Sequence, residues 1–277
     1  MLLALVFIYC VAVTEEAIFH VAETDEGKKG SRIIGRVLPA AVKLWLRSQV
    51  ESVKQLDISL RGRDRQIISG YIPGVAVSAE QAVYEGIHID QLHLSADDIR
   101  INIGQVLRGK PLRLLKAFPV IGEVALSEES LNASLCSGLL QEGLADFWRQ
   151  LVRLPSVAQA VSSRYGDLPL HSEVELENPQ VRLSDRTLAL SFYPKTPSRK
   201  AEQPVLLATE LIVVSHHILR LESPRWLKSL EDVSAASSTP VEALSGFQWD
   251  LGRETQLSDL TLSNKQLHCS GQVMVNP

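Results

Sequence analysis

The order of apolar and polar residues divides the chain into a helical segment and a longer region of strands. Between Arg32 and Lys54, apolar residues recur every three or four positions, which is typical of an amphipathic helix. Trp45 belongs to this apolar stripe, and Pro39 marks the point where the helix begins or kinks. Basic residues cluster on the opposite face, within roughly 60° of one another at about 100° per residue. They are Arg32, Arg36, Lys43, Arg47 and Lys54.

A helix with one basic and one apolar face is compatible with two roles. It can pack its apolar stripe on a protein core and expose the cations to water. It can also lie on an anionic surface such as a phospholipid membrane. The sequence of the helix alone leaves both roles open.

After this helix, apolar and polar residues alternate with a period of two, which predicts half-buried strands. Because most of these strands follow one another without a helix between them, we expect a mainly antiparallel sheet. The alternating residues are Leu56, Ile58 and Leu60; Ile87 and Ile89; Leu92 and Leu94; Ile99, Ile101 and Ile103; Val174 and Leu176; Val181 and Leu183; Leu188 to Phe192; Leu211 and Val213; Leu260 and Leu262; and Val273 and Val275.

Three segments repeat a local pattern in which apolar-x-apolar-Ser is followed by three spacer residues and apolar-x-apolar. They are Leu92–Ile101, Val181–Leu190 and Leu260–Cys269. The pattern predicts two strands joined by a polar turn, with Ser95, Ser184 and Ser263 entering the turns. The copies are too far apart for stacked repeats, so we interpret them as recurring hairpins.

A second helical region is predicted after Ser127, a residue type that often caps helix N-termini. Glu128 and Glu129 place negative charge in the first turn, where the helix dipole favours it. Gly138 and Gly143 weaken the region, so we expect a break before Gly143 and a further helix after it.

A third, short helix is predicted after Pro224, and it places Trp226 between Arg225 and Lys228. A tryptophan flanked by cations suits the headgroup region of a membrane, and it equally suits an exposed helix end.

Composition limits the possible functions without selecting one. The chain has 277 residues, 45% of them hydrophobic and 22% charged, enough for a buried core in one large domain or two small ones. A net charge of -4 argues against general nucleic-acid binding, which needs a basic surface to neutralise phosphates. Cys10, Cys136 and Cys269 lack the spacing of a disulfide framework or a zinc site, and they suggest free thiols in a reducing compartment.

Residues 1–29 are predicted to lie outside the fold. The apolar stretch from Met1 to Val13 is shorter than the roughly 20 residues that cross a bilayer. It also lacks the basic start and the cleavage site of a clear signal peptide. It is therefore a weak anchor or a disordered extension, and the polar, acidic stretch that follows favours an extension. Residues 30–277 are expected to form a single domain.

Motifs that would indicate catalysis or a metal site are incomplete. The segment Gly104–Lys110 matches the first seven positions of a nucleotide-binding P-loop, but Pro111 replaces the hydroxyl residue that binds magnesium. His88 and Asp90 share one face of a predicted strand, while His93 points to the other face, so we do not expect them to bind a metal together. We therefore predict no catalytic residues, no metal site and no cofactor.

The stretch from Asp64 to Leu135 carries a family resemblance. Its most informative pieces, in order and closely spaced, are SGYIPGVAVSA, YEGIHI, IRINIGQVLRGKPLRL and VIGEVALSEESLNASL. With the preceding helix, the chain from Ser31 to about Leu154 resembles the LmeA-like phospholipid-binding family, in the form seen in photosynthetic bacteria. The resemblance brings no catalytic residues.

The resemblance implies an α+β fold similar to half of a tubular lipid-binding module. A long, bent antiparallel sheet would wrap around the amphipathic N-terminal helix, with a second helical segment beside it, and leave an apolar groove for acyl chains. Residues 105–115 then become a strand or loop carrying Arg108, Lys110 and Arg113. The expected groove residues are Ile87, Ile89, Leu92, Leu94, Ile99, Ile101, Ile103 and Trp45.

These observations favour a non-enzymatic protein that binds phospholipid, preferably anionic, and associates peripherally with the cytoplasmic side of a membrane. The alternative is a structural or partner-binding scaffold at the membrane, without bound lipid, whose groove its own helix fills. A lipid-modifying enzyme is a third hypothesis, which requires converging His, Asp or Ser side chains. The expected headgroup or membrane-facing residues are Arg32, Arg36, Lys43, Arg47, Arg225 and Lys228.

Overall fold

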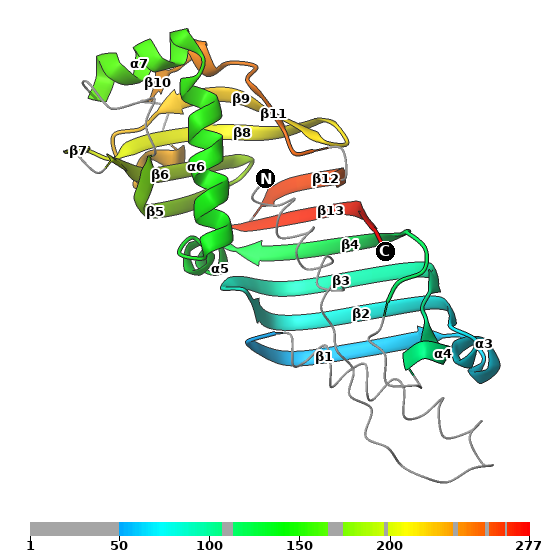
Figure 1. Ribbon diagram of the computed structural model, residues 1–277. Helices are drawn as coiled ribbons and strands as arrows, with labels where there is room; N and C mark the ends of the chain where they lie inside the picture. The colour runs from blue at the N-terminus through cyan, green and yellow to red at the C-terminus, as the bar shows by residue number, and fades with distance from the viewer. Residues whose placement is uncertain are drawn as a thin grey trace.

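The structure consists of two antiparallel sheets and the helices that connect them (Figure 1). It is a computed structural model that describes residues 50–106, 113–165, 174–196, 199–234, 238–252, 255–263 and 265–277. The first sheet has six strands in the order β1-β2-β3-β4-β13-β12. Its strands are β1 (Ser52–Arg61), β2 (Tyr71–Tyr84), β3 (Ile87–Arg100), β4 (Phe118–Ser127), β12 (Thr255–Ser263) and β13 (Gln266–Val275).

The second sheet has the order β10-β9-β8-β6-β5, with β11 paired to β9 and β7 paired to β6. Its strands are β5 (Glu175–Ser184), β6 (Thr187–Thr196), β7 (Arg199–Lys200), β8 (Val205–Ser215), β9 (Ile218–Trp226), β10 (Thr239–Pro240) and β11 (Gln248–Asp250).

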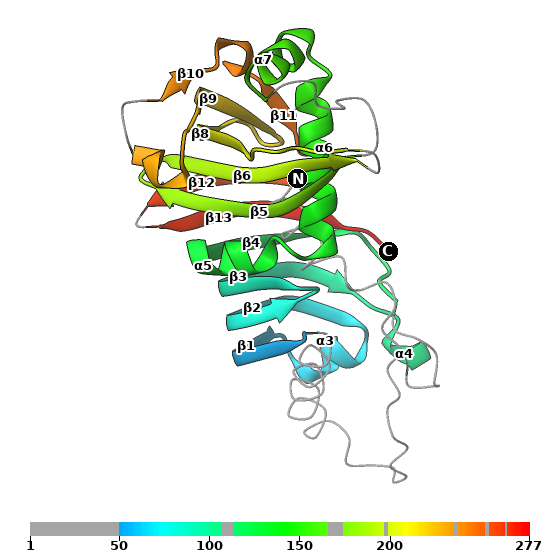
Figure 2. The same ribbon diagram turned by 90° about the vertical axis from the view of Figure 1, so that its left-hand side faces the viewer.

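The C-terminal strands β12 and β13 form a hairpin in which β13 lies beside β4, so β12 is the edge strand of the first sheet. The two sheets meet at this edge (Figures 1 and 2). The Arg186 N–H donates to the Leu262 carbonyl at 3.2 Å, and the Leu257 N–H donates to the His216 carbonyl at 2.5 Å. Strands from both halves of the chain therefore form one continuous, curled β-structure.

Most helical residues lie between β4 and β5. The longest helix, α6, runs across the inner face of the second sheet (Figure 1), where Trp148 meets Phe192 edge-on with ring centroids 5.2 Å apart. The helices are α3 (Asp64–Ile68), α4 (Ile103–Val106), α5 (Glu128–Ser134), α6 (Gly138–Val152) and α7 (Pro155–Tyr165), with short 3-10 helices η1 (Leu230–Ser234) and η2 (Glu242–Leu244).

The strand β3 keeps its apolar side chains on one face although their spacing changes twice. Ile89 and Leu92 are three residues apart, and strict alternation would place them on opposite faces. Gln81 lies on β2 beside this change with a φ of 47°, and Asp98 marks the second change with a φ of 55°. Such breaks also increase the local bend of a sheet.

Two of the three predicted hairpins are confirmed. The segments Val181–Leu190 and Leu260–Cys269 form the β5–β6 and β12–β13 hairpins. The hairpin predicted for Leu92–Ile101 is wrong, because Leu92 to Arg100 continue β3 without a turn. That strand is paired with β2 on one edge and β4 on the other, and the local pattern contains no information about these partners.

The second helical region begins where the sequence predicts. The Ser127 hydroxyl caps α5 by accepting a hydrogen bond from the Ser130 N–H at 3.2 Å. The break, however, lies before Gly138 and not before Gly143, because Ser137 caps a new helix there with its own hydroxyl. Gly143 is a buried residue inside α6.

Three further boundaries differ from the sequence prediction. Lys54 lies in β1, so the predicted amphipathic helix cannot extend that far; its residues up to 49 lie outside the described chain. Ile103 begins α4 and does not continue a strand. Pro224 and Trp226 complete β9 and do not open a helix, because β8 and β10 provide strand partners there. Tertiary pairing of this kind overrides local periodicity.

Candidate functional site

One face of the six-stranded sheet is apolar from β1 to β12. Cross-strand pairing places apolar residues side by side, as in the row formed by Ile58, Val77 and Leu94. The inner face comprises Val53, Leu56, Ile58 and Leu60 of β1; Val75, Val77, Ala79 and Ala82 of β2; Leu92, Leu94 and Ala96 of β3; Val120, Val124 and Leu126 of β4; Leu267, Cys269, Val273 and Val275 of β13; and Leu257, Leu260 and Leu262 of β12.

Part of this face, which we call the strand face, is an apolar cluster on three adjacent strands. Its members are Val53, Leu56 and Ile58 of β1, Val77, Ala79 and Ala82 of β2, and Leu92 of β3. Within the described residues, no helical side chain joins this cluster. Three buried and four half-buried apolar residues thus form a surface of the kind that hydrocarbon covers favourably.

The two ends of the apolar face are closed by packed side chains. At one end, Ile87 and Ile89 are 1% and 2% exposed and belong to the main core, which also includes side chains of α5 and α6. At the other end, Ile99 and Ile101 are buried in a second cluster, against which Ile103 of α4 packs. The strand face lies between these two packed regions.

The predicted groove residues therefore occupy different environments. Leu92 is half-buried between the strand face and the main core, and Leu94 is half-buried between that face and the second cluster. The five isoleucines of the prediction lie in the two packed ends. Trp45 lies outside the described residues.

The predicted membrane-facing residues of the second sheet also differ from one another. Arg225 is half-buried and donates to the Val233 carbonyl at 2.7 Å, which fastens η1 to β9. Lys228 is exposed. Trp226 is only 6% exposed, with the Arg164 guanidinium 5.9 Å from its ring centre, so neither a headgroup position nor an exposed helix end describes it. The remaining four, Arg32, Arg36, Lys43 and Arg47, lie outside the described residues.

A cavity of about 80 Å³ lies in the main core between α5, α6 and the second sheet. Its lining is apolar except for Thr209, whose hydroxyl lies 3.0 Å from the Glu222 carbonyl. An apolar cavity of about 150 Å³ is needed to hold a benzene-sized molecule. The cavity is therefore too small for an acyl chain.

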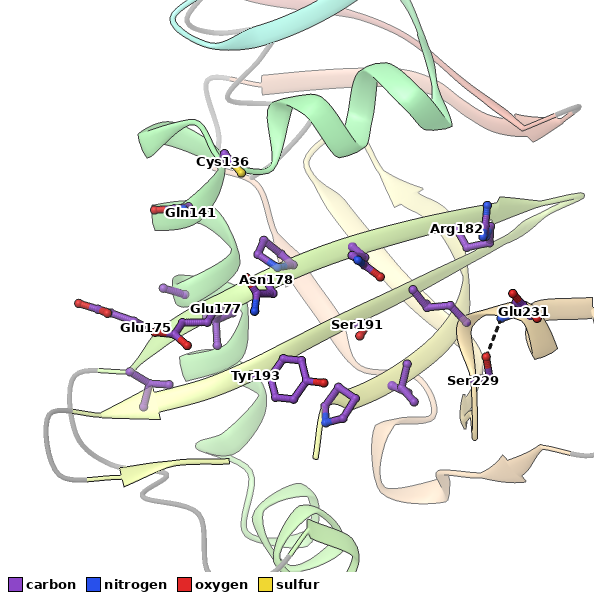
Figure 3. A pocket seen from close by; sticks show the side chains of 18 of the residues that line it. Cys136, Gln141, Glu175, Glu177, Asn178, Arg182, Ser191, Tyr193, Ser229 and Glu231 are labelled. Atoms are coloured by element: carbon purple, nitrogen blue, oxygen red, sulfur yellow. Dashed lines mark hydrogen bonds between the residues drawn. The ribbon is translucent and has the colours of Figure 1, made fainter. Parts of the chain in front are cut away.

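A cleft of about 1280 Å³ lies between α6 and the edge strand β5 (Figure 3). Carboxylates outnumber cations along it: Glu142, Glu175, Glu177 and Glu231 face Arg182 and Lys228. Arg182 is paired with Glu128 at 2.7 Å, and Lys195 neutralises Glu177 at 2.6 Å. Hydrocarbon in this cleft would desolvate charged groups at a large cost in free energy, so the cleft does not suit acyl chains.

The outer face of the six-stranded sheet brings together Ser78, His93 and Glu123. The Ser78 hydroxyl and His93 Nδ1 are 3.0 Å apart, and His93 is paired with Glu123 across β3 and β4. His93 and Glu123 line a solvent-open hollow of about 250 Å³ together with Asp259 and His268, and not an enclosed pocket of the kind that favours general acid–base catalysis. Within the described residues, no three His, Cys, Asp or Glu side chains are placed to hold a metal ion.

None of the helices in the described part of the chain has the length and apolar composition of a bilayer span. A curled antiparallel sheet with a continuous apolar inner face defines a class of protein that accommodates hydrocarbon along a sheet. A family model described as LmeA-like phospholipid-binding matches residues 29–272. The chain therefore belongs to the LmeA-like phospholipid-binding family, as the sequence resemblance indicates. No curated protein and no solved structure matches it.

Proposed function

We propose that the protein binds an anionic phospholipid, with the acyl chains against the strand face, and that it works as a peripheral protein on the cytoplasmic side of a membrane. The observation that carries the proposal is the apolar cluster of β1, β2 and β3, to which no described helix contributes a side chain. Each methylene group removed from water contributes about 0.8 kcal/mol, so contact along three strands is enough to hold an acyl chain.

The basic residues of the N-terminal segment support the anionic preference. Arg32, Arg36, Lys43 and Arg47 share one face of the predicted helix, and a cationic residue near an anionic bilayer contributes about 1 kcal/mol to binding. We include these residues in the proposal on the strength of their spacing alone.

A pair of double variants tests the acyl-chain site. Val77 and Leu94 are cross-strand partners on the inner face, whereas Ala76 and Ser95 are the adjacent partners on the outer face. Changing Val77→Gln and Leu94→Gln places two amides against hydrocarbon, so we expect at least about tenfold less bound phospholipid per protein. The measurement is solvent extraction and mass spectrometry of lipid that co-purifies with the protein.

The outer pair, Ala76→Gln with Ser95→Gln, is the matched control and should retain the wild-type lipid content. Cooperative thermal unfolding of each variant shows that the fold is intact. Equal lipid loss in both pairs, or wild-type protein that carries no phospholipid, would contradict the proposal and favour a scaffold without bound lipid.

A further inference from the structure

We propose that one end of the molecule, which we call the basic end, docks on the surface of an anionic phospholipid membrane. The basic end consists of the end of β1, the helix α3, the end of β3 and residues 113–116. Its cations are Arg61, Arg63, Arg65, Arg100, Arg113 and Lys116, and all six are exposed. The proposal extends the proposed function, because a membrane is the source of the phospholipid.

Backbone hydrogen bonds hold three distant segments together at this end. The Ile101 N–H donates to the Gly70 carbonyl at 2.9 Å, and the Leu115 N–H donates to the Arg100 carbonyl at 2.8 Å. The Asn102 side-chain oxygen accepts from the Arg113 N–H at 2.7 Å. The three segments that carry the cations are therefore hydrogen-bonded to one another. They lie at the extremity of the molecule where α3 and α4 lie (Figure 1).

Gly70 shows how closely these segments approach. Its φ is 84°, and a Cβ at this position would lie 2.3 Å from the Ile101 carbonyl oxygen. Any other residue would push α3 away from the end of β3. The glycine thus keeps the cations of α3 beside those that follow β3.

Positive charge exceeds negative charge at the basic end. Its carboxylates are Asp64, Asp97 and Asp98, which leaves a surplus of three positive charges in a chain whose net charge is -4. Arg61 pairs with Asp97, and Lys116 and Arg100 both pair with Asp98, at 2.6 Å and 3.9 Å. Within the described residues, no ion pair engages the remaining side chains Arg63, Arg65 and Arg113.

An exposed leucine lies among these cations. The side chain of Leu115 is 61% exposed, and Lys116 follows it directly. Its neighbour Leu114 turns inward and packs against the cluster that contains Ile101. An apolar side chain flanked by cations is suited to insert at the level of the headgroups.

The basic end also adjoins the apolar face. The second cluster, which contains Ile101, also includes Val75 and Leu94, and these residues continue the inner face next to Val77. The acidic cleft beside α6 lies toward the other extremity of the molecule (Figures 1 and 3). The difference in charge between the basic end and this cleft favours docking through the basic end, with the apolar face reached from the docked end.

The test compares variants in the full chain. Arg63→Gln, Arg65→Gln and Arg113→Gln together remove the three cations that form no ion pair with a described residue, and Leu115→Ser separately removes the apolar contact. The probe is sedimentation with vesicles of phosphatidylcholine containing about one third phosphatidylglycerol, a composition at which surface cations act strongly. We expect the triple variant to bind on the order of 100-fold more weakly and with a lower salt dependence, and Leu115→Ser to bind several-fold more weakly.

A charge-matched control changes Arg149→Gln, Arg153→Gln and Lys265→Gln, which are exposed residues away from the basic end. It should bind the vesicles like wild type. Equal binding of the two triple variants would overturn the proposal, as would wild-type binding to single-stranded RNA but not to these vesicles. Binding of detergent-solubilised phosphatidylglycerol to delipidated protein does not require docking on a bilayer and should be unchanged in the basic-end variant, so failure of the docking surface and failure of the acyl-chain site give different results.

Discussion

Cys136 and Cys269 show how position controls the chemistry of identical residues. Cys136 is exposed beside the polar cleft, whereas Cys269 is 3% exposed on the inner face of β13. Burial, together with the charge of Asp259, raises the pKa of the Cys269 thiol to about 12. The thiolate is the reactive form, so its population at Cys269 is negligible near neutral pH.

This difference predicts selective alkylation. In a Cys10→Ser background at pH 8, iodoacetamide should modify Cys136 in the folded protein and Cys269 only after unfolding, as mass spectrometry of peptides can show. The raised pKa of Cys269 also makes stability depend on pH. The thiol loses its proton near pH 9 in the unfolded chain and near pH 12 in the folded chain. Between these pH values, the free energy of unfolding therefore falls as pH rises, by up to about 1.4 kcal/mol per pH unit. Rapid labelling of Cys269 in the native state would contradict the packed position of β13.

The short helix α5 connects the two sheets through side chains. The Asn132 amide donates to the Val181 carbonyl at 2.8 Å and accepts from the Val181 N–H at 2.9 Å. Glu128 accepts from the Leu183 N–H at 2.7 Å on the same strand of the second sheet. On the other side, the Ser134 hydroxyl accepts from the His88 N–H of the first sheet at 2.8 Å. Side chains of α5 therefore make hydrogen bonds with the backbone of β5 that a neighbouring strand would otherwise make.

Changing Asn132→Ala should lower the free energy of unfolding by about 2 kcal/mol, because two backbone groups of Val181 lose their partner. The control Gln141→Ala, at an exposed position of α6, should change it by less than about 0.5 kcal/mol. Urea unfolding followed by circular dichroism measures both. If the two variants are equally stable, α5 contributes little to joining the sheets.

The whole molecule combines an apolar interior with a basic end and, beside α6, a cleft in which carboxylates outnumber cations. In the region of the second sheet, α6 fills the apolar interior almost completely and leaves a cavity of about 80 Å³. On β1, β2 and β3, the described members of the apolar cluster are all strand residues. In the proposed function, the second sheet supports the fold and the first sheet contacts hydrocarbon.

Ligand linkage at the level of the whole molecule provides a further prediction. Delipidated protein should unfold at a higher temperature in the presence of phosphatidylglycerol, by on the order of 5 °C at 100 times the dissociation constant. ATP or GTP with magnesium should give no shift, because Pro111 occupies the position of the magnesium-binding hydroxyl. Differential scanning fluorimetry can compare these ligands directly. A shift with nucleotide alone would reverse this assignment.

The sequence by itself determined most features that depend on neighbouring residues. The alternation at Leu56, Ile58 and Leu60 predicted β1, and the turn pattern predicted the hairpin after Ser184. Ser127 predicted the start of α5, because capping involves only the next three residues. The motifs between residues 64 and 135 indicated the family that the family model confirms.

Only the tertiary structure decided how these elements are used. Ile89 and Leu92 both belong to the apolar face of β3, yet Ile89 is buried in the main core and Leu92 is half-buried between that core and the strand face, since burial depends on where α5 and α6 lie. Long-range pairing placed Trp226 in a strand. The basic end joins segments about 50 residues apart in sequence, from Arg61 to Lys116. Periodicity reports the face of an element and contains no information about the partner that covers it.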